Sequence, residues 1–199
     1  MNGENKVKTI RALCMALLLA LLLGAPAGAA EFSADLQMSV SQRTMKGKIF
    51  VKGVRQRLEF SSPQGKLITL VNLKTGKNVV VMPAAKMYME TPLRSTEGIY
   101  GLVKGKKALP PEAKKVASGK KSGYVCDVYE IKNKKGNTVK VWMARGLDYP
   151  IFTITSDPNA GQVVSLLKNI KEGKQSDSLF KVPAGYRPMP TGGGSPNRP

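Results

Sequence analysis

The sequence predicts an α+β domain built on one antiparallel sheet, and three observations carry this prediction. Apolar and polar residues alternate with a period of two over several short runs, which is the pattern of strands with one buried face. Short turn-like segments separate these runs, and no long helical patterns alternate with them, so a meandering sheet is favoured over βαβ units. The chain has 199 residues, of which 42% are hydrophobic and 23% charged, as expected for about one folded domain.

The N-terminus has the three zones of a secretory signal peptide. A basic start precedes an apolar run over residues 12–23 and a small-residue stretch over residues 24–30. The apolar run is too short to span about 30 Å of hydrocarbon. We therefore expect residues 1–30 to be removed during export, leaving Ala30 or Glu31 as the first residue, with Glu31 favoured.

The first predicted strand covers residues 32–41 and alternates strictly. Its apolar members occupy every second position and are Phe32, Ala34, Leu36, Met38 and Val40. A turn is expected over residues 45–48, and the second and third strands, over 49–51 and 58–60, flank Gly53.

Three further strands complete the first half of the predicted sheet. Apolar, β-branched runs over residues 67–73 and 78–82 are separated by residues 74–77, a loop of hairpin length. A short strand over residues 87–89 follows Pro83.

Residues 91–122 lose the alternation and are strongly basic. Between Lys104 and Lys121 the only acidic residue is Glu112. The lysines of this segment, our candidates for contact with an anionic surface, are Lys104, Lys106, Lys107, Lys114, Lys115, Lys120 and Lys121. We expect a solvated, mobile loop insertion here.

Strand patterns resume in the second half of the chain. Residues 124–131 and 138–145 are predicted to form a hairpin, and another strand is expected over residues 149–155. Residues 162–170 satisfy helical spacing as well as strand composition, so their own pattern leaves both open. The tail, residues 190–199, is low in complexity and is expected to be disordered.

Several segments carry a family resemblance. They are residues 45–52, 57–59, 123–129 before a tryptophan-bearing strand, 167–173, and 178–186 with its closing Phe-x-x-Pro-x-Gly-Tyr pattern. Together they resemble exported bacterial proteins related to the periplasmic lipoprotein carrier LolA, within a domain family of unknown function. We therefore take residues 31–189 as one LolA-like domain.

The resemblance implies an unclosed, highly curved antiparallel sheet, a half β-barrel, with short helices or loops covering the concave face. It also implies that residues 162–170 form a strand. Proteins similar in this way carry acyl chains or lipid-modified polypeptides through the periplasm. The function implied is that of a non-enzymatic periplasmic binding or carrier protein for an apolar ligand, with a lipid or a lipidated protein as its partner.

Apolar strand faces rich in methionine are the candidate ligand site. Seven of the nine methionines lie beyond residue 30, and flexible thioethers suit a cavity that accepts acyl chains of variable shape, although they also fill ordinary cores. The residues that we expect to line this cavity are Leu36, Met38, Val40, Val139, Val141 and Met143.

The residue inventory argues against an enzyme. The chain has no histidine, which excludes Ser–His, Cys–His and histidine–metal mechanisms. We also find no paired carboxylates, metal-ligand cluster or glycine-rich phosphate loop, so we expect no catalysis, no cofactor and no metal. Cys126 is the only cysteine beyond residue 30, so an intramolecular disulfide is excluded and a buried thiol is expected.

The positive charge has three interpretations. Thirty-two lysines and arginines against 13 acidic residues give a net charge of +19. Nucleic-acid binding is disfavoured because aromatic residues are only 6% of the chain and do not interleave with the basic ones. An anionic membrane surface or acidic partner, and a merely solvated surface, remain. The alternative function is therefore a structural or adaptor protein of the envelope that binds an acidic partner through its lysine-rich loop. We expect a monomer.

Overall fold

A computed structural model describes residues 30–40, 43–63, 65–93, 109–132, 137–157 and 161–189. Twelve strands form one sheet in the order β12-β6-β5-β4-β3-β2-β1-β11-β10-β9-β8-β7. The strands are β1 (Glu31–Val40), β2 (Arg43–Lys52), β3 (Arg55–Ser62), β4 (Gly65–Asn72), β5 (Lys77–Met82), β6 (Met87–Pro92), β7 (Lys114–Lys121), β8 (Tyr124–Lys132), β9 (Thr138–Ala144), β10 (Tyr149–Asp157), β11 (Gly161–Glu172) and β12 (Arg187–Pro188). All neighbours pair antiparallel except β12, which lies parallel to β6.

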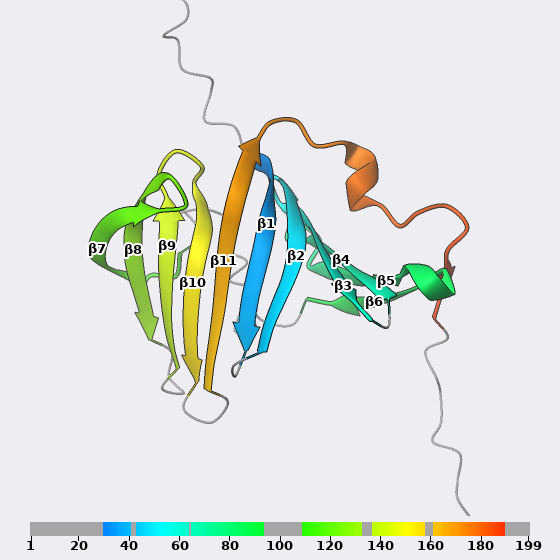
Figure 1. Cartoon of the computed structure of the whole chain (residues 1–199), viewed down its shortest axis with the longest axis horizontal. Helices are drawn as coiled ribbons and strands as arrows, with labels where there is room; N and C mark the ends of the chain where they lie inside the picture. The colour runs from blue at the N-terminus through cyan, green and yellow to red at the C-terminus, as the bar shows by residue number, and fades with distance from the viewer. Residues whose placement is uncertain are drawn as a thin grey trace, which may run out of the picture.

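The sheet consists of two meanders that meet in its middle. The first runs from β1 to β6 and the second from β7 to β11, and the β1–β11 pairing joins them. The two outermost strands, β7 and β12, do not pair with each other, so the sheet stays open. Figure 1 shows it bending, with β11, β1 and β2 across the front and β3 to β6 turning away behind them.

Gly47 of β2 lies very close to the neighbouring strand β3. In register it lies between Leu36 of β1 and Phe60 of β3. A Cβ atom on Gly47 would collide with the carbonyl oxygen of Glu59 and lie 2.9 Å from Cδ1 of Phe60. Only a residue without a side chain permits this close approach of the Phe60 ring to the β2 backbone.

The concave face of the sheet carries the main core. The alternating residues of β1 that the sequence marks as apolar, from Phe32 to Met38, are all buried. They pack with apolar residues of β2, β3, β4, β10 and β11, including Val51, Leu58 and Ile151. The period-two pattern therefore identified the buried face of the central strand correctly.

The C-terminal segment covers part of the convex face. Val182 and Tyr186 pack on Ile68, Leu70 and Val81 of β4 and β5. The segment includes the short 3-10 helix η3 (Asp177–Phe180), which lies in front of the sheet in Figure 1.

Basic side chains of β3 hold this segment in place. Arg57 donates from Nη1 to the carbonyl oxygen of Leu179 over 2.9 Å. Arg55 pairs with Asp177 at 2.7 Å and lies over the Phe180 ring, 5.2 Å from its centroid. The closing Phe-x-x-Pro-x-Gly-Tyr pattern thus anchors the end of the domain to the outside of the sheet.

Two segments without a clear sequence pattern, residues 162–170 and 114–121, both form strands. Residues 162–170 form part of β11, which confirms a strand. Lys114–Lys121 forms β7 and is not part of a mobile loop, so that part of the loop prediction was wrong. The alternation is missing there because β7 is an edge strand whose first seven residues are all exposed, so no face had to be apolar.

The predicted helical cover of the concave face is not shown. Within the described residues the helices are η1 (Pro83–Ala85) and η3, both short, and η3 packs against β3 on the convex side. None of these helices is long and apolar enough to cross a membrane. The expected signal peptide and the expected disordered tail lie almost wholly outside the described residues.

Candidate functional site

The six predicted lining residues lie on β1 and β9. Leu36 and Met38 are buried in the main core cluster. Val141 and Met143 are also buried, but in a second cluster around Tyr129 of β8. The remaining two residues, at the strand ends, are half-buried and are Val40 and Val139.

Strand register shows that Met38 and Val141 share one face. Met38 pairs with Ser165 of β11, Ser165 with Thr153 of β10, and Thr153 with Val141 of β9. Directly paired residues project to the same side of a sheet, and three strand spacings separate β1 from β9 by roughly 14 Å. The structure therefore places both predicted groups on the concave face, as two separate clusters.

The same face carries apolar side chains that remain exposed. Met45 of β2 pairs with Met38, and Leu67 of β4 pairs with Phe60, which lies opposite Gly47 and Leu36. Met89 of β6 reaches this face through its pairing with Val80 and, beyond it, Thr69. The exposed fractions of Met45, Leu67 and Met89 are 47%, 42% and 38%. We call these three residues the apolar rim.

Sequence reasoning missed the apolar rim for an identifiable reason. It placed Met45 in a turn, whereas β2 begins two residues earlier, at Arg43. Extending the β1 alternation across a hairpin to its partner strand would have placed Met45 opposite Met38.

A buried polar pair lies deeper on the concave face. Gln56 of β3 is 1% exposed, and neither atom of its amide has a hydrogen-bond partner among the described residues. It pairs with Val51 and Val71, both core residues. Burial raises the pKa of the nearby Tyr149 phenol above its ordinary value. The adjacent Gln56 side chain lowers this pKa, but its effect is smaller than that of burial. The Tyr149 ring packs on Phe32 with ring centroids 5.0 Å apart.

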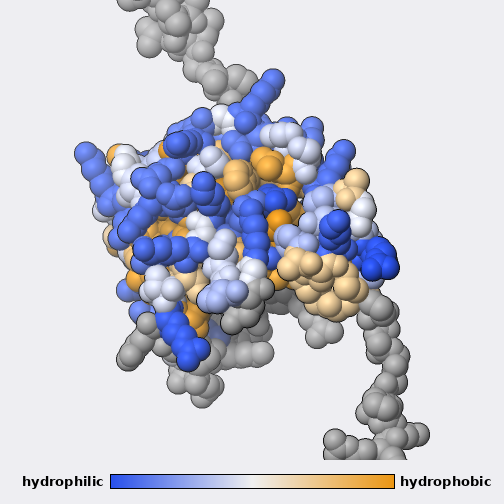
Figure 2. Space-filling model, turned by 45° about the vertical axis from the view of Figure 1, so that its right-hand side comes forward, coloured by the Kyte–Doolittle hydropathy of each residue, from blue (hydrophilic) through white to orange (hydrophobic). Residues whose placement is uncertain are grey.

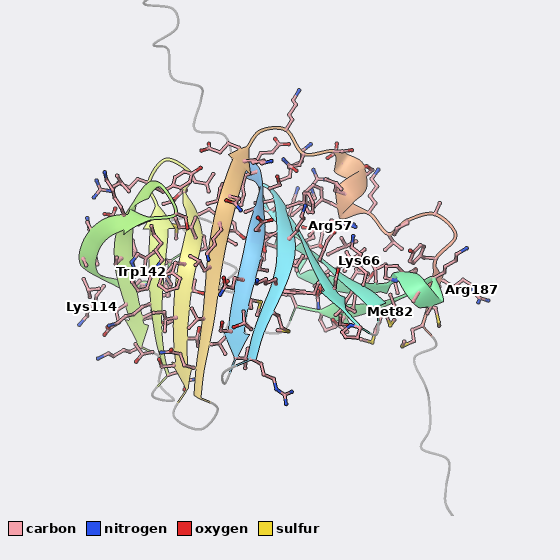
Figure 3. All side chains as sticks on the ribbon, viewed as in Figure 1. Arg57, Lys66, Met82, Lys114, Trp142 and Arg187 are labelled. Carbon is pink, nitrogen blue, oxygen red and sulfur yellow. The ribbon has the colours of Figure 1, made fainter. Side chains whose placement is uncertain are left out.

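Of the seven candidate lysines, four fall in β7 and three lie outside the described residues. Lys115 pairs with Asp127 at 2.8 Å, and the Lys121 ammonium lies 4.0 Å from the centroid of the Phe152 ring. Lys114 and Lys120 make no ion pair within the described part of the chain. Figure 3 shows Lys114 projecting from the free edge of the sheet. The three outside the described residues are Lys104, Lys106 and Lys107.

Asp127 of β8 joins strands β7, β8 and β9 through charge. Its carboxylate accepts hydrogen bonds from Arg145 at 2.8 Å and from Ser118 at 3.1 Å, and it pairs with Lys115. Arg145 and then Lys115 hold the pKa of Asp127 far below its usual range, against the opposing effect of burial. The charged form is therefore the one that stabilises the fold.

We expect Asp127→Asn to destabilise the protein at neutral pH and to flatten its acid response. A depressed folded-state pKa contributes stability that is present above the unfolded value of about 3.9 and is lost as the pH falls below it. The urea midpoint of the wild type should therefore fall between about pH 7 and about pH 3, and that of the variant should fall less. An equal fall in both proteins would contradict this role.

Metal-binding and thiol chemistry have little support in the described residues. No group of three or more histidine, cysteine, aspartate or glutamate side chains gathers within them. Cys126 is fully buried, its thiol donates to the carbonyl oxygen of Tyr124 over 3.6 Å, and burial raises its pKa. The thiol is a buried core group, as the sequence suggested.

The solved structures that resemble this one are distant in sequence. An uncharacterized conserved protein from Thermus thermophilus superposes with a TM-score of 0.59 at 8% identity, over 82% of this chain and 91% of the other. MucB, in the Pseudomonas aeruginosa MucA/MucB complex, superposes with a TM-score of 0.52 at 9% identity, over 79% of this chain and 57% of the other. A LolA superfamily protein from Nitrosomonas europaea gives a TM-score of 0.42 at 10% identity, over 79% and 91% of the two chains.

Comparison of the sequence itself identifies the family of this chain. None of the curated proteins matches this chain significantly. The family described as "Domain of unknown function (DUF4412)" matches residues 32–158, which is more than half of the chain and includes β1 to β10 almost completely. The chain therefore belongs to the DUF4412 family, and its fold is similar to those of the Thermus thermophilus protein and of the MucA/MucB structure.

Proposed function

We propose that this protein is a non-enzymatic periplasmic binding or carrier protein that holds an apolar ligand against the concave face of its sheet. The ligand is the acyl chain of a lipid or of a lipidated polypeptide, and the protein is exported as a monomer after removal of residues 1–30. The observation that carries the proposal is the apolar rim, three large apolar side chains that stay exposed on the same face of the sheet as the buried Leu36 and Met38.

Exposed apolar side chains gathered on one face favour a binding role over a plain core. Scattered single apolar residues are normal on protein surfaces, whereas several on one face next to an apolar core favour a ligand or partner site. Two members of the rim are methionines, whose flexible thioethers adapt to chains of variable shape. Each methylene buried there contributes about 0.8 kcal/mol, so a partly enclosed acyl chain is held usefully. A polypeptide partner is also compatible with the fold, since a solved structure holds MucB in complex with MucA.

The test is uptake of a fluorescent fatty-acid probe. We expect wild type to bind the probe and the Met45→Lys/Leu67→Lys double variant to lose at least tenfold in affinity, because a charge beside an acyl chain must be desolvated. Both positions are exposed, so thermal unfolding should change little. The deeper variants Met38→Lys and Met143→Lys should also abolish uptake if they remain folded.

The matched control changes exposed apolar residues elsewhere. Val54 lies in the β2–β3 turn and Val116 on β7, with exposed fractions of 37% and 52%. The Val54→Lys/Val116→Lys variant adds the same charge outside the rim and should bind the probe as wild type does. Absence of probe uptake by wild type, or equal losses in both double variants, would refute the carrier proposal.

The alternative role, attachment to an anionic surface through the lysine-rich segment, is favoured by one feature of β7. Lys114 and Lys120 project from a free edge without ion pairs among the described residues. We expect binding to phosphatidylglycerol vesicles that weakens as salt rises, since exposed charges are screened over about 8 Å at physiological ionic strength. Lys114→Gln/Lys120→Gln should weaken binding severalfold. Equal binding to neutral and anionic vesicles would show that these lysines are solvated surface residues without a role in membrane binding.

A further inference from the structure

A groove lies on the convex face, on the opposite side of the sheet from the apolar rim. It has a volume of about 650 Å³ and crosses β11, β1, β2, β3 and β4. This volume is within the range of small-molecule sites, roughly 300–1,000 Å³. In the view of Figure 2, hydrophilic residues dominate the surface, and apolar ones show between them and in one protruding patch at the lower right. Apart from Leu36 and Gly47, the residues that line the groove are all polar or charged.

Strand register explains why lysines converge on this groove. Lys48 of β2 and Lys168 of β11 both pair with Asp35 of β1, one on each side. Their backbones are thus two strand spacings, about 10 Å, apart and their side chains project to the same face. Lys46 lies two residues before Lys48 and projects in the same direction, opposite Gln37. Three flexible ammonium groups can therefore meet over one point of the groove.

The acids of the groove do not neutralise these three lysines. Glu59 of β3 pairs with Arg57 at 2.5 Å and with Lys66 at 2.6 Å. Burial acts to raise the pKa of Glu59, but the hydrogen bonds from Lys66 and Arg57 outweigh it, and the pKa lies below its ordinary value. Figure 3 shows Arg57 and Lys66 reaching this region from neighbouring strands.

Asp35 is the second acid of the groove and is also partnered. It accepts a hydrogen bond from Nδ2 of Asn169 over 2.7 Å. Within the described residues Lys46, Lys48 and Lys168 form no ion pair, although Asp35 lies between two of them in the register. The charges of Glu59 and Lys66 compensate each other. The remaining charged residues of the lining are three lysines and one carboxylate, that of Asp35.

We propose that this groove binds a phosphate monoester carried on a small, hydroxyl-bearing scaffold such as glycerol. A phosphate monoester carries between one and two negative charges and three free oxygens, which suit three separate ammonium groups better than the two oxygens of a carboxylate do. Gln37 and Ser61 also line the groove and provide hydrogen-bonding groups for hydroxyls. The same ester could come from a soluble metabolite or from the headgroup of a membrane lipid.

The experiment titrates the full-length exported protein with two probes that share this chemistry. Glycerol phosphate represents the soluble source, and phosphatidylcholine vesicles containing phosphatidic acid represent the lipid source, with pure phosphatidylcholine vesicles as blank. Calorimetry should show binding of at least one probe, weakening as salt rises. Binding of glycerol phosphate assigns a soluble ligand, and binding of the phosphatidic acid vesicles alone assigns a headgroup.

Two charge-matched variants test where the probe binds. Lys48→Gln/Lys168→Gln removes two of the converging charges and should weaken binding at least tenfold, since hydrogen bonds to charged groups are among the stronger ones. Lys74→Gln/Lys174→Gln removes two exposed lysines outside the groove and outside β7, and should change affinity less than threefold. All four side chains are exposed, so both variants should fold. Equal weakening by both variants, or no binding of either probe by wild type, would overturn the proposal.

Discussion

Gly47→Ala should be among the most destabilising single substitutions in this domain, lowering the free energy of unfolding by about 2–4 kcal/mol. The added Cβ would collide with the Glu59 carbonyl oxygen and lie 2.9 Å from the Phe60 ring. Because one of these obstacles is backbone that pairs β2 with β3, the two strands must separate locally to accommodate it. Urea-induced unfolding, followed by far-ultraviolet circular dichroism, measures the loss.

A second glycine provides the matched control for this substitution. Gly119 lies in the edge strand β7, with no atom within 4 Å of the position where a Cβ would be built. Gly119→Ala should leave stability unchanged or raise it slightly, because alanine restricts the unfolded chain more than glycine does. If the two variants unfold at the same urea concentration, the close approach of β3 to Gly47 is not important for stability.

Phe32→Ala should lower the free energy of unfolding by about 3–5 kcal/mol, the usual range for removing a fully buried aromatic ring. Phe32 has no exposed surface, belongs to the main core cluster and packs edge-on against Tyr149, with an interplanar angle of 76°. The substitution would open a cavity between β1 and β10, two strands that are not neighbours in the sheet. It therefore weakens side-chain packing across the concave face.

Phe50 is the control for the size of this effect. It lies on β2 and is only half-buried. Its pairing with Ser33 and Arg57 places it on the convex side, opposite to Phe32. Phe50→Ala removes the same atoms and should cost less than half as much as Phe32→Ala in urea unfolding. Equal losses at the two positions would mean that the concave core is not the main source of stability.

The fold could be predicted from the sequence wherever a strand has one buried face. The alternation in β1 identified Leu36 and Met38 as core residues because burial selects apolar side chains at every second position. The same rule could not detect β7, because neither of its faces is buried. It was also ambiguous for β11, where apolar residues occur on both faces and imitate helical spacing.

The candidate sites depend on register, which a sequence pattern specifies weakly. The convergence of Lys48 and Lys168 on either side of Asp35 joins residues from the two ends of the chain, so no local spacing reveals it. The unpartnered amide of Gln56 is different, since a glutamine at an inward position between core strands is visible in the alternation of β3. Local patterns thus predicted which strand faces are buried. Pairing between distant strands determines which side chains lie together on each face.

The pairing of β1 with β11 also constrains the order in which this protein can fold. Asn169 and Asp35, which hydrogen-bond across that pairing, are 134 positions apart in the chain. Closing so long a loop is entropically unfavourable, and domains dominated by such distant contacts fold slowly, in milliseconds to seconds. A chain that crosses a membrane N-terminus first would deliver β1 long before its β11 partner. One edge of β1 must then wait unpaired, so a chain exported in this way would need protection from aggregation until its last long strand arrives.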